Sequence, residues 1–225
     1  SITKTMNGKT ACRIYLIRHG ETTNAGEICF NGHFDVDLSD RGKNQSRRIA
    51  DVLKILPIKA VYSSDLKRTQ IGAKYVADEH KLQHTPYTEL RELAFGEWEG
   101  LSVAEINLDH PDKLKKRLKN IEQFRVEGGE SFFQLKDRVI PKFKEIISRH
   151  PYDSIVILCH GGVIRTILAH VLGISTKNLF RINQSYSSVN IIQFYEEGNP
   201  VVELMGGSYK NIHSLESPDK KIPIQ

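Results

Sequence analysis

Short apolar runs alternate along this chain with longer segments in which apolar residues recur at helical spacing. The runs are rich in Ile, Val, Leu and Tyr, which favour buried strands, and polar or Gly-containing segments separate them. Because strand and helix patterns alternate for most of the length, we predict a layered α/β domain with a mostly parallel sheet. The predicted strands span 12–17, 60–62, 85–87, 154–158, 188–195 and 201–205.

Helix start and stop signals divide the remaining segments. Capping-box patterns begin at Ser102 and Ser131, where Ser is followed three residues later by Glu or Gln. Pro57 ends the first helix, Gly173 ends the last, and the Ser-Ser-Asp run at 63–65 is expected to cap the helix that follows it. The predicted helices are 39–56, 66–80, one beginning at 102, 131–150 and 161–171.

A single domain is predicted for most of the 225 residues, because no repeat and no Pro- or Ser-rich linker divides the chain. We expect residues 12–207 to form this single domain. Within it, we expect residues 103–130 to be an insertion that forms a lid over the functional site. Residues 1–11 and 208–225 are expected to be flexible tails.

Cysteine usage and hydropathy favour a cytoplasmic protein. The cysteines Cys12, Cys29 and Cys159 are odd in number and have no paired spacing, which argues against a disulfide framework. No apolar run approaches the roughly 20 residues needed to cross a bilayer, so we expect no membrane partner. Residues 1–9 also lack the apolar core of a secretory signal.

The charge balance is mildly basic, with a formal net charge of +5 and a pI near 9.0. No pattern of stacking aromatic residues accompanies the charge, so we expect no nucleic-acid partner and interpret the bias as suited to a small anionic substrate. No Cys-x-x-Cys pair predicts a metal site, and no Gly-x-x-x-x-Gly-Lys-Ser/Thr segment predicts a nucleotide-binding loop. We expect neither a metal nor a cofactor.

Two strand ends carry the same His-Gly pair. His19 follows the first predicted strand and His160 follows the fourth. Because parallel strands end at one edge of a sheet, we expect both imidazoles and Arg18 to face a single cleft. A lone histidine at a strand end is more often a structural residue, but a repeated pattern favours a functional site. Arg68, in the first turns of the helix after the second strand, is placed either to grip a phosphate with Arg18 or to face solvent.

The loop around the only Trp of the chain is rich in carboxylates. This irregular segment, 90–100, follows the weak third strand, and loops at strand ends supply catalytic groups. A carboxyl group near apolar side chains stays protonated more readily and can act as a general acid. Spacing alone does not choose among Glu89, Glu92, Glu97 and Glu99.

Together these segments resemble the signature of the histidine phosphatase superfamily, the phosphoglycerate mutase-like proteins. An Arg-His-Gly triplet alone is a weak signal, but the ordered set of segments covers about residues 12–195 and is specific. The resemblance implies a three-layer α/β/α sandwich with a mostly parallel central sheet, and chemistry through phosphohistidine. The matching segments are 18–22, 31–33, 37–42, 62–69, 90–92, 95–100, 128–131 and 159–165.

The resemblance also implies a role for each matching residue. His19 resembles the nucleophile that becomes phosphohistidine, and Glu92 resembles the proton donor. Arg18, Arg68 and His160 resemble the phosphate pocket, and a backbone N–H at the following helix N-terminus is suited to a phosphate oxygen. The implied substrate-binding residues are Asn24, Asn31, Gly32 and Gly161.

The loop around Trp98 resembles the phosphatase branch, which includes α-ribazole-5′-phosphate phosphatases of cobalamin synthesis and broad-specificity phosphatases. We therefore expect a monomer or homodimer that hydrolyses a small phosphomonoester, with α-ribazole 5′-phosphate as one candidate. A 2,3-bisphosphoglycerate-dependent phosphoglycerate mutase and a non-catalytic binding protein on the same fold are the alternatives. In one departure, Ala25 stands where many relatives have Asn, and Asn24 comes one position earlier.

The predicted insertion combines cations with neighbouring aromatic residues. Its lysines and Arg117 would either close over an anionic substrate or form a solvated helix face, and we favour the solvated face. Phe124, Phe132 and Phe133 would line a pocket or, in the favoured interpretation, lie mostly in the core. The lysines are Lys113, Lys115, Lys116 and Lys119.

Overall fold

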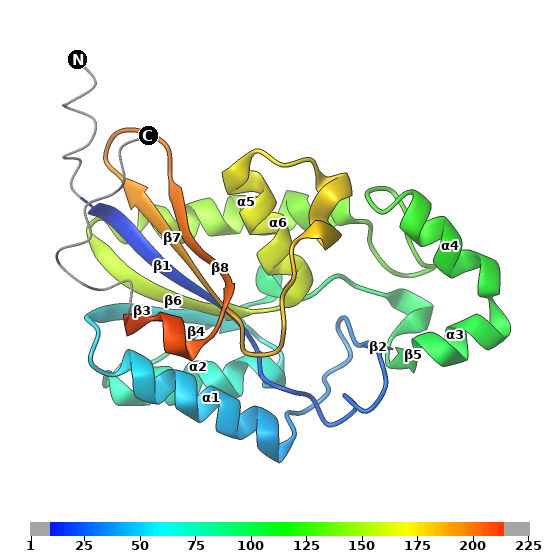
Figure 1. Ribbon diagram of the computed structural model, residues 1–225, viewed down its shortest axis with the longest axis horizontal. Helices are drawn as coiled ribbons and strands as arrows, with labels where there is room; N and C mark the ends of the chain where they lie inside the picture. Colours follow the sequence, from blue (N-terminus) through cyan, green and yellow to red (C-terminus); the bar gives the residue numbers. More distant parts are fainter. Residues whose placement is uncertain (1–9, 214–225) are drawn as a thin grey trace.

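A computed structural model describes residues 10–213, and their centre is one six-stranded sheet with the order β4-β3-β6-β1-β7-β8 (Figure 1). β4, β3, β6 and β1 are parallel, whereas β7 pairs antiparallel with both β1 and β8. The predicted mostly parallel sheet is confirmed. Its strands are β1 (Thr10–Arg18), β3 (Ile58–Ser64), β4 (Thr85–Tyr87), β6 (Asp153–Cys159), β7 (Val189–Tyr195) and β8 (Val201–Gly207).

Helices cover both faces of the sheet, so the buried strands are apolar on both sides. In β1, Ile14 and Leu16 belong to the core cluster on the α5 and α6 side, while Tyr15 and Ile17 belong to the cluster on the α1 and α2 side (Figure 1). Alternate side chains of one strand therefore serve opposite layers, and the predicted three-layer arrangement is confirmed. The covering helices are α1 (Asp40–Leu53), α2 (Lys67–Glu79), α5 (Phe132–Ser148) and α6 (Gly161–Leu172).

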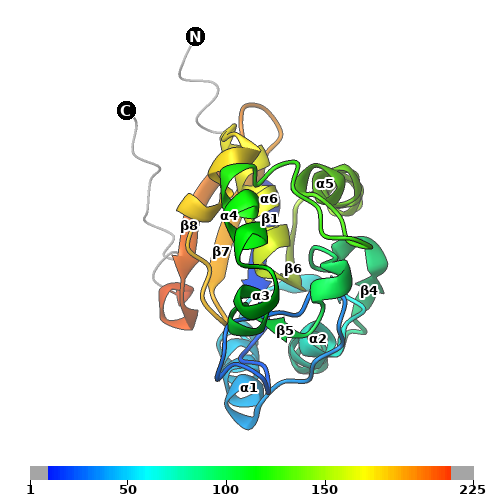
Figure 2. The ribbon, with the colours of Figure 1, turned by 90° about the vertical axis from the view of Figure 1, so that its right-hand side faces the viewer.

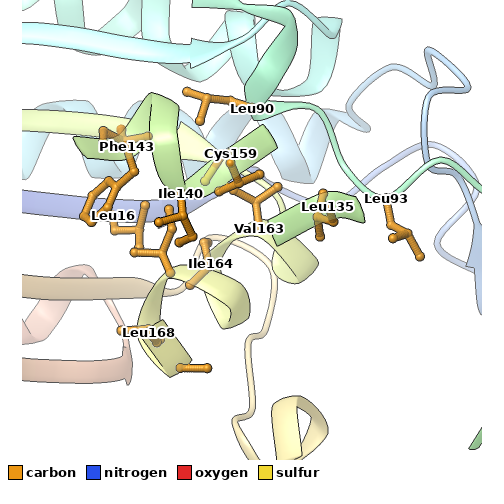
Figure 3. Close-up of a cluster of buried hydrophobic side chains, with 14 of the residues drawn as sticks. Leu16, Leu90, Leu93, Leu135, Ile140, Phe143, Cys159, Val163, Ile164 and Leu168 are labelled. Carbon is orange, nitrogen blue, oxygen red and sulfur yellow. The ribbon is translucent and has the colours of Figure 1, made fainter. Parts of the chain in front are cut away.

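The larger core cluster anchors the ends of the two central strands (Figure 3). Leu16 of β1 and Cys159 of β6 share this cluster with Ile140 of α5 and Ile164 of α6, and each is buried. The close-packed core therefore holds the ends of β1 and β6 rigidly, and with them the residues that follow these strands.

A smaller unit lies beyond one end of the sheet (Figures 1 and 2). It consists of the antiparallel pair β2 (Cys29–Phe30) and β5 (Leu101–Ser102), followed by α3 (Val103–Asp109) and α4 (Pro111–Lys119). The capping box predicted at Ser102 is present, because Ser102 Oγ accepts from Glu105 N–H at 3.1 Å and Glu105 Oε2 accepts from Ser102 N–H at 2.7 Å. The predicted insertion is therefore two short helices set beside the strand ends.

Two predicted helix boundaries are wrong. α1 has the expected N-cap, Ser39, but ends at Leu53 rather than near residue 56, because β3 already begins at Ile58 and the residue before Pro57 is disfavoured in a helix. The Ser-Ser-Asp run does not cap α2, whose N-cap is Leu66 without a side-chain cap. Its Asp65 instead pairs with Arg91 at 2.6 Å.

The fold extends beyond both expected boundaries of the domain. β1 begins at Thr10, and a 3₁₀ turn at Tyr209–Asn211 follows β8, after which Ile212 is fully buried in the core beneath α1. Residues 10–11 and 208–213 are thus part of the fold, and the rest of the expected tails lies outside the described residues.

Within 10–213, no helix has the length and apolar character needed to cross a bilayer. Further 3₁₀ turns span Thr88–Leu90, Gly96–Trp98 and Thr176–Arg181.

Candidate active site

The carboxyl ends of β1 and β6 bring two histidines together. In this parallel pair Arg18 is opposite Cys159, so His19 and His160 follow at the same edge of the sheet. Their ring centroids are 5.3 Å apart, and His19 N–H donates to the Cys159 carbonyl oxygen at 3.1 Å. The two histidines are adjacent, as the repeated His-Gly pattern predicts, but His160 is fully buried, and of the expected residues only His19 and Arg18 line a cavity.

His19 is held with one ring nitrogen available. The side chain is 5% exposed, and its Nδ1 donates to the Gly20 carbonyl oxygen at 2.7 Å. That bond selects the neutral tautomer in which Nε2 carries the lone pair. Burial, followed by the charges of Arg18 and Arg68, holds the pKa of His19 well below its usual value. At neutral pH the side chain is an uncharged base, as a nucleophile requires.

Arg18 is fixed by the loop before β7. Its Nη1 donates to the Gln184 carbonyl oxygen at 2.6 Å, and its guanidinium carbon lies 4.5 Å from the centroid of the Tyr186 ring. Burial lowers the pKa of Arg18 without removing its charge. Its Nε is buried and has no hydrogen-bond partner among residues 10–213, which leaves a donor for a ligand oxygen.

Arg68 is buried at the second position of α2. It is 1% exposed and donates to the carbonyl oxygens of Gly32 and Phe34 at 2.6 and 2.8 Å. Burial lowers the pKa of Arg68 to about 10, so the group remains charged at neutral pH. The alternative of a solvated charge on the helix surface is therefore wrong for this arginine.

His160 is fully buried behind His19. Its Nε2 lies 2.7 Å from Ser64 Oγ at the end of β3, and its Nδ1 has no hydrogen-bond partner in the described chain. When the Ser64 hydroxyl donates to Nε2, the proton of neutral His160 is on Nδ1 and is available to an acceptor. Burial, followed by the charge of Arg68, holds the pKa of His160 well below its usual value.

The two buried histidines predict a loss of stability in mild acid. Below an unfolded-state pKa of about 6.5, the unfolded chain takes up protons that native His19 and His160 exclude. Stability is therefore fully present above that pH and is lost toward the lower native pKa values, by up to ~1.4 kcal/mol per pH unit for each group. Urea unfolding between about pH 7.5 and 5.5 measures this slope. His160→Gln should flatten it, whereas the same change at exposed His110 should not; equal slopes in both variants would contradict the expectation.

A cavity of about 320 Å³ opens beside His19, between the strand ends and the smaller unit. A larger hollow of about 710 Å³ shares Tyr186 with it but is lined by none of the candidate catalytic residues. The smaller cavity is lined by phenylalanine side chains, among them Phe132, and by the guanidinium groups of four arginines. It therefore offers both apolar and cationic surface. Its charged lining residues are Arg18, Arg68, Arg117, Arg165 and Glu92.

Glu92 is the carboxylate of its loop that lines this cavity. Its Oε1 accepts from Leu93 N–H at 2.8 Å, and its Oε2 accepts from Gly162 N–H at 3.0 Å. The absence of a Cβ at Gly162 makes this contact possible, because a Cβ there would lie 2.3 Å from Glu92 Oε1. Each carboxylate oxygen keeps a further lone pair for a substrate atom.

The other three carboxylates that the sequence left open have different surroundings. Glu99 accepts backbone N–H groups at Phe34, at 2.6 Å, and at Phe95, at 2.9 Å, so it shapes the loop. Glu97 is exposed, and Glu89 does not line the cavity. Of these four carboxylates, Glu92 alone lines the cavity that His19 also lines.

Arg138 of α5 holds the backbone that carries Glu92. It donates to the carbonyl oxygens of Arg91 at 2.8 Å and of Glu92 at 2.9 Å, and it pairs with Glu130. Glu130 in turn accepts from Ala94 N–H at 3.0 Å. These bonds fix the loop on both sides of the carboxylate.

The expected substrate-binding residues divide into two groups. Asn31 and Gly32 line the cavity, but Asn24 and Gly161 do not. Asn24 instead exchanges hydrogen bonds with Asn31, at 2.7 and 3.2 Å, so it orients that side chain. At the start of α6 it is Gly162, not Gly161, that lines the cavity and bonds to Glu92.

The charged residues of α4 differ in exposure, which the pattern of charges did not predict. The four lysines of this helix are exposed, in agreement with a solvated face, but Arg117 is buried and lines the cavity. Phe132 is buried in the cavity wall, Phe124 packs on Trp98 with ring centroids 5.6 Å apart, and Phe133 is 41% exposed.

Sequence reasoning missed four residues at the site. Arg165 is part of the segment that resembles the family, but only the structure shows that α6 directs this residue toward the cavity. Arg117 was grouped with the lysines around it, and Ser64 with the expected helix cap. Tyr186 lies in a loop without periodicity, where no sequence signal marked it.

Potential metal ligands are dispersed in the described chain. Within 10–213, no three His, Cys, Asp or Glu side chains are grouped as a metal site requires. His80 and His84 are four residues apart, but their Nε2 atoms lie 3.0 Å from the Leu53 carbonyl oxygen and 3.1 Å from Gln70 Oε1, respectively.

Comparison with known proteins identifies the family. The sequence model of the histidine phosphatase superfamily (branch 1) matches residues 14–206. The chain is 33% identical over 196 residues to phosphoglycerate mutase-like protein 4 of Arabidopsis thaliana, covering 86% of this chain and 84% of that protein. It is 28% identical over 194 residues to the adenosylcobalamin/alpha-ribazole phosphatase of Escherichia coli, with 80% and 91% covered. The solved structure of mycobacterial glucosyl-3-phosphoglycerate phosphatase aligns with a TM-score of 0.77 at 26% identity, covering 87% of this chain and 99% of that chain. The chain therefore belongs to the histidine phosphatase superfamily, and it is a phosphatase.

Proposed function

We propose that this phosphatase hydrolyses a small phosphomonoester through a phosphohistidine on His19. The observation that carries the proposal is the state of His19: a buried, neutral imidazole with Nδ1 bonded to Gly20 and flanked by two guanidinium groups. Such a group can attack phosphorus, whereas a protonated imidazole has no lone pair to do so.

In the first step, His19 Nε2 forms a bond to phosphorus as the bond from phosphorus to the ester oxygen breaks. Glu92 gives its proton to that oxygen, so the leaving group departs as an alcohol. Arg18 and Arg68 hold the equatorial phosphate oxygens and stabilise the charge that gathers there. The Nδ1 proton of His160 is a further donor to the phosphate.

In the second step, water attacks the phosphohistidine. Glu92, now a carboxylate, takes a proton from the water, and the P–N bond breaks to release inorganic phosphate and neutral His19. Its bonds to Leu93 and Gly162 hold the carboxylate in one place for both transfers. The cycle needs no cofactor.

The cavity volume of about 320 Å³ supports a small metabolite as the substrate. α-Ribazole 5′-phosphate is one candidate, since a relative at 28% identity is an alpha-ribazole phosphatase. Phosphoglycerate mutase activity is the second candidate, because a relative at 33% identity is named phosphoglycerate mutase-like. Stimulation of 2-phosphoglycerate and 3-phosphoglycerate interconversion by 2,3-bisphosphoglycerate would favour the mutase.

Chemical trapping tests the phosphohistidine. Enzyme quenched in base during turnover of a ³²P-labelled phosphomonoester should carry label that survives base and is lost in acid, as expected of a phosphoramidate bond. Absence of labelled protein at every quench time, with phosphate still released, would overturn the proposal and favour direct attack by water.

A further inference from the structure

Two guanidinium groups in the cavity, those of Arg117 and Arg165, have no role in the chemistry proposed above. Arg117 of α4 is 9% exposed and points inward, while the lysines beside it face solvent. Its guanidinium carbon lies 5.3 to 6.0 Å from four ring centroids that enclose it. These rings belong to Phe30, Phe95, Phe132 and Phe180.

Arg117 differs from the other buried arginines in what it binds. Arg68 donates to two carbonyl oxygens, and Arg138 donates to carbonyl oxygens and pairs with Glu130. Across residues 10–213, by contrast, Arg117 takes part in no hydrogen bond or ion pair, and its polar contacts are the faces of aromatic rings. Burial lowers the pKa of Arg117 to about 10, so the group is still charged at neutral pH. The carboxylate of Glu92 attracts Arg117 without forming an ion pair with it, and a buried charge without hydrogen bonds is costly unless a counter-ion joins it.

A second cation stands beside Arg117. Arg165 of α6 lies 5.2 Å from the centroid of the Phe180 ring, and Arg117 lies 5.3 Å from the same centroid. Arg165 Nε donates to the Ile182 carbonyl oxygen at 2.7 Å, which anchors the side chain. Two like charges around one ring repel each other, and an anion between them would relieve that repulsion.

The charge of the cavity exceeds that of one phosphate group. Its lining holds four guanidinium groups and one carboxylate, a net charge of +3 with Glu92 ionised and more when Glu92 carries a proton. A phosphomonoester brings a charge of about −2 at neutral pH. A residual positive charge remains on the side of Arg117 and Arg165, and one carboxylate would balance it.

We propose that Arg117 and Arg165 bind a carboxylate of the substrate, so that the enzyme acts on phosphomonoesters of small hydroxy acids. The inference rests on the proposed function and adds the class of substrate. The guanidinium groups would give charge-assisted hydrogen bonds to the carboxylate, while the phenylalanine rings exclude water from the pair. The same phosphate attached to a neutral alcohol would leave Arg117 without an acceptor.

Two pairs of substrates test the inference, since each pair differs mainly in one carboxylate. One pair is O-phosphoserine and O-phosphoethanolamine, and the other is 3-phosphoglycerate and glycerol 3-phosphate. We expect kcat/KM of the wild-type enzyme to favour the carboxylate member by roughly 10- to 100-fold, the range for a hydrogen-bonded charged group. Equal kcat/KM values within both pairs would overturn the inference.

The variant Arg117→Met keeps an unbranched stem in the aromatic cage and removes the charge. We expect it to reduce the preference for the carboxylate member to less than about 3-fold, mainly by raising KM for that member. Arg117→Lys should restore part of the preference, because a lysine keeps the charge. Lys116→Met, on the exposed face of the same helix, should behave as wild type. Thermal unfolding confirms that each variant is folded before it is assayed.

The outcomes separate the inference from the proposed function. If Arg117→Met lowers kcat/KM equally for both members of each pair, Arg117 only anchors α4 and the inference is wrong. If the wild-type enzyme forms a labelled phosphohistidine but shows no preference, the inference alone fails. If no phosphohistidine forms, the proposed function fails, whatever the preference.

Discussion

His19→Ala should abolish turnover of every phosphomonoester, with kcat lower by at least about 10⁴-fold, the scale seen when a covalent nucleophile is removed. The loss is expected because Ala leaves no atom that can form the bond to phosphorus, while the guanidinium groups that hold the phosphate remain. KM or the binding of inorganic phosphate should therefore change far less than kcat. Initial rates with p-nitrophenyl phosphate, together with phosphate binding by calorimetry, measure the two effects separately.

The matched control for His19→Ala is His110→Ala, which truncates an exposed histidine outside the cavity. It should retain wild-type kcat when purified in parallel, which shows that truncating a histidine outside the cavity does not by itself lower turnover. Turnover by His19→Ala within about 10-fold of wild type would contradict the role of His19, because the attack on phosphorus would then come from another group.

Glu92→Gln should separate the two steps of the reaction. Glutamine cannot protonate an alkyl leaving group, so kcat for alkyl phosphates should fall by roughly 10²- to 10⁴-fold. p-Nitrophenolate leaves without a proton, so the first step on p-nitrophenyl phosphate should remain fast while the water attack becomes slow. Stopped-flow absorbance should then show a burst of about one nitrophenolate per active site, followed by slow turnover.

Glu97→Gln is the control for this variant, because Glu97 lies in the same loop and is exposed. It should show neither a burst nor a leaving-group dependence beyond that of wild type. Equal losses on aryl and alkyl phosphates in Glu92→Gln, without a burst, would indicate that Glu92 acts through the shape of the cavity and not through proton transfer.

The α/β fold was predictable because its signals are local. The apolar runs of β1 and β6 are continuous over residues 14–17 and 155–159, the helices on both faces show helical spacing, and capping boxes start α3 at Ser102 and α5 at Ser131. The errors fall where a neighbour in space decides the outcome. Ser64 was expected to cap α2, but its hydroxyl bonds to His160 from a strand distant in sequence.

The ends of the fold were misjudged for a similar reason. Residues 208–213 have no periodic pattern, yet Ile212 is fully buried because α1 and the sheet edge provide an apolar surface for it. A short apolar segment carries no sign of such a surface in its own residues.

The sequence by itself predicted that His19, His160 and Arg18 would meet. Parallel strands end at one edge of a sheet, and a His-Gly pair after each of two such strands is visible without coordinates. The resemblance to the histidine phosphatases then supplied roles for these residues, and membership of that family is shown by the match over residues 14–206.

Only the tertiary structure decided what surrounds that centre. It holds Glu92, the carboxylate to which the resemblance pointed, in the cavity wall, because the start of α6 offers a backbone N–H to this one. It turned Arg117 inward against four aromatic rings while the adjacent lysines faced solvent. Such choices depend on contacts between loops and helices far apart in sequence, and the pattern of polar and apolar positions in one segment does not contain them.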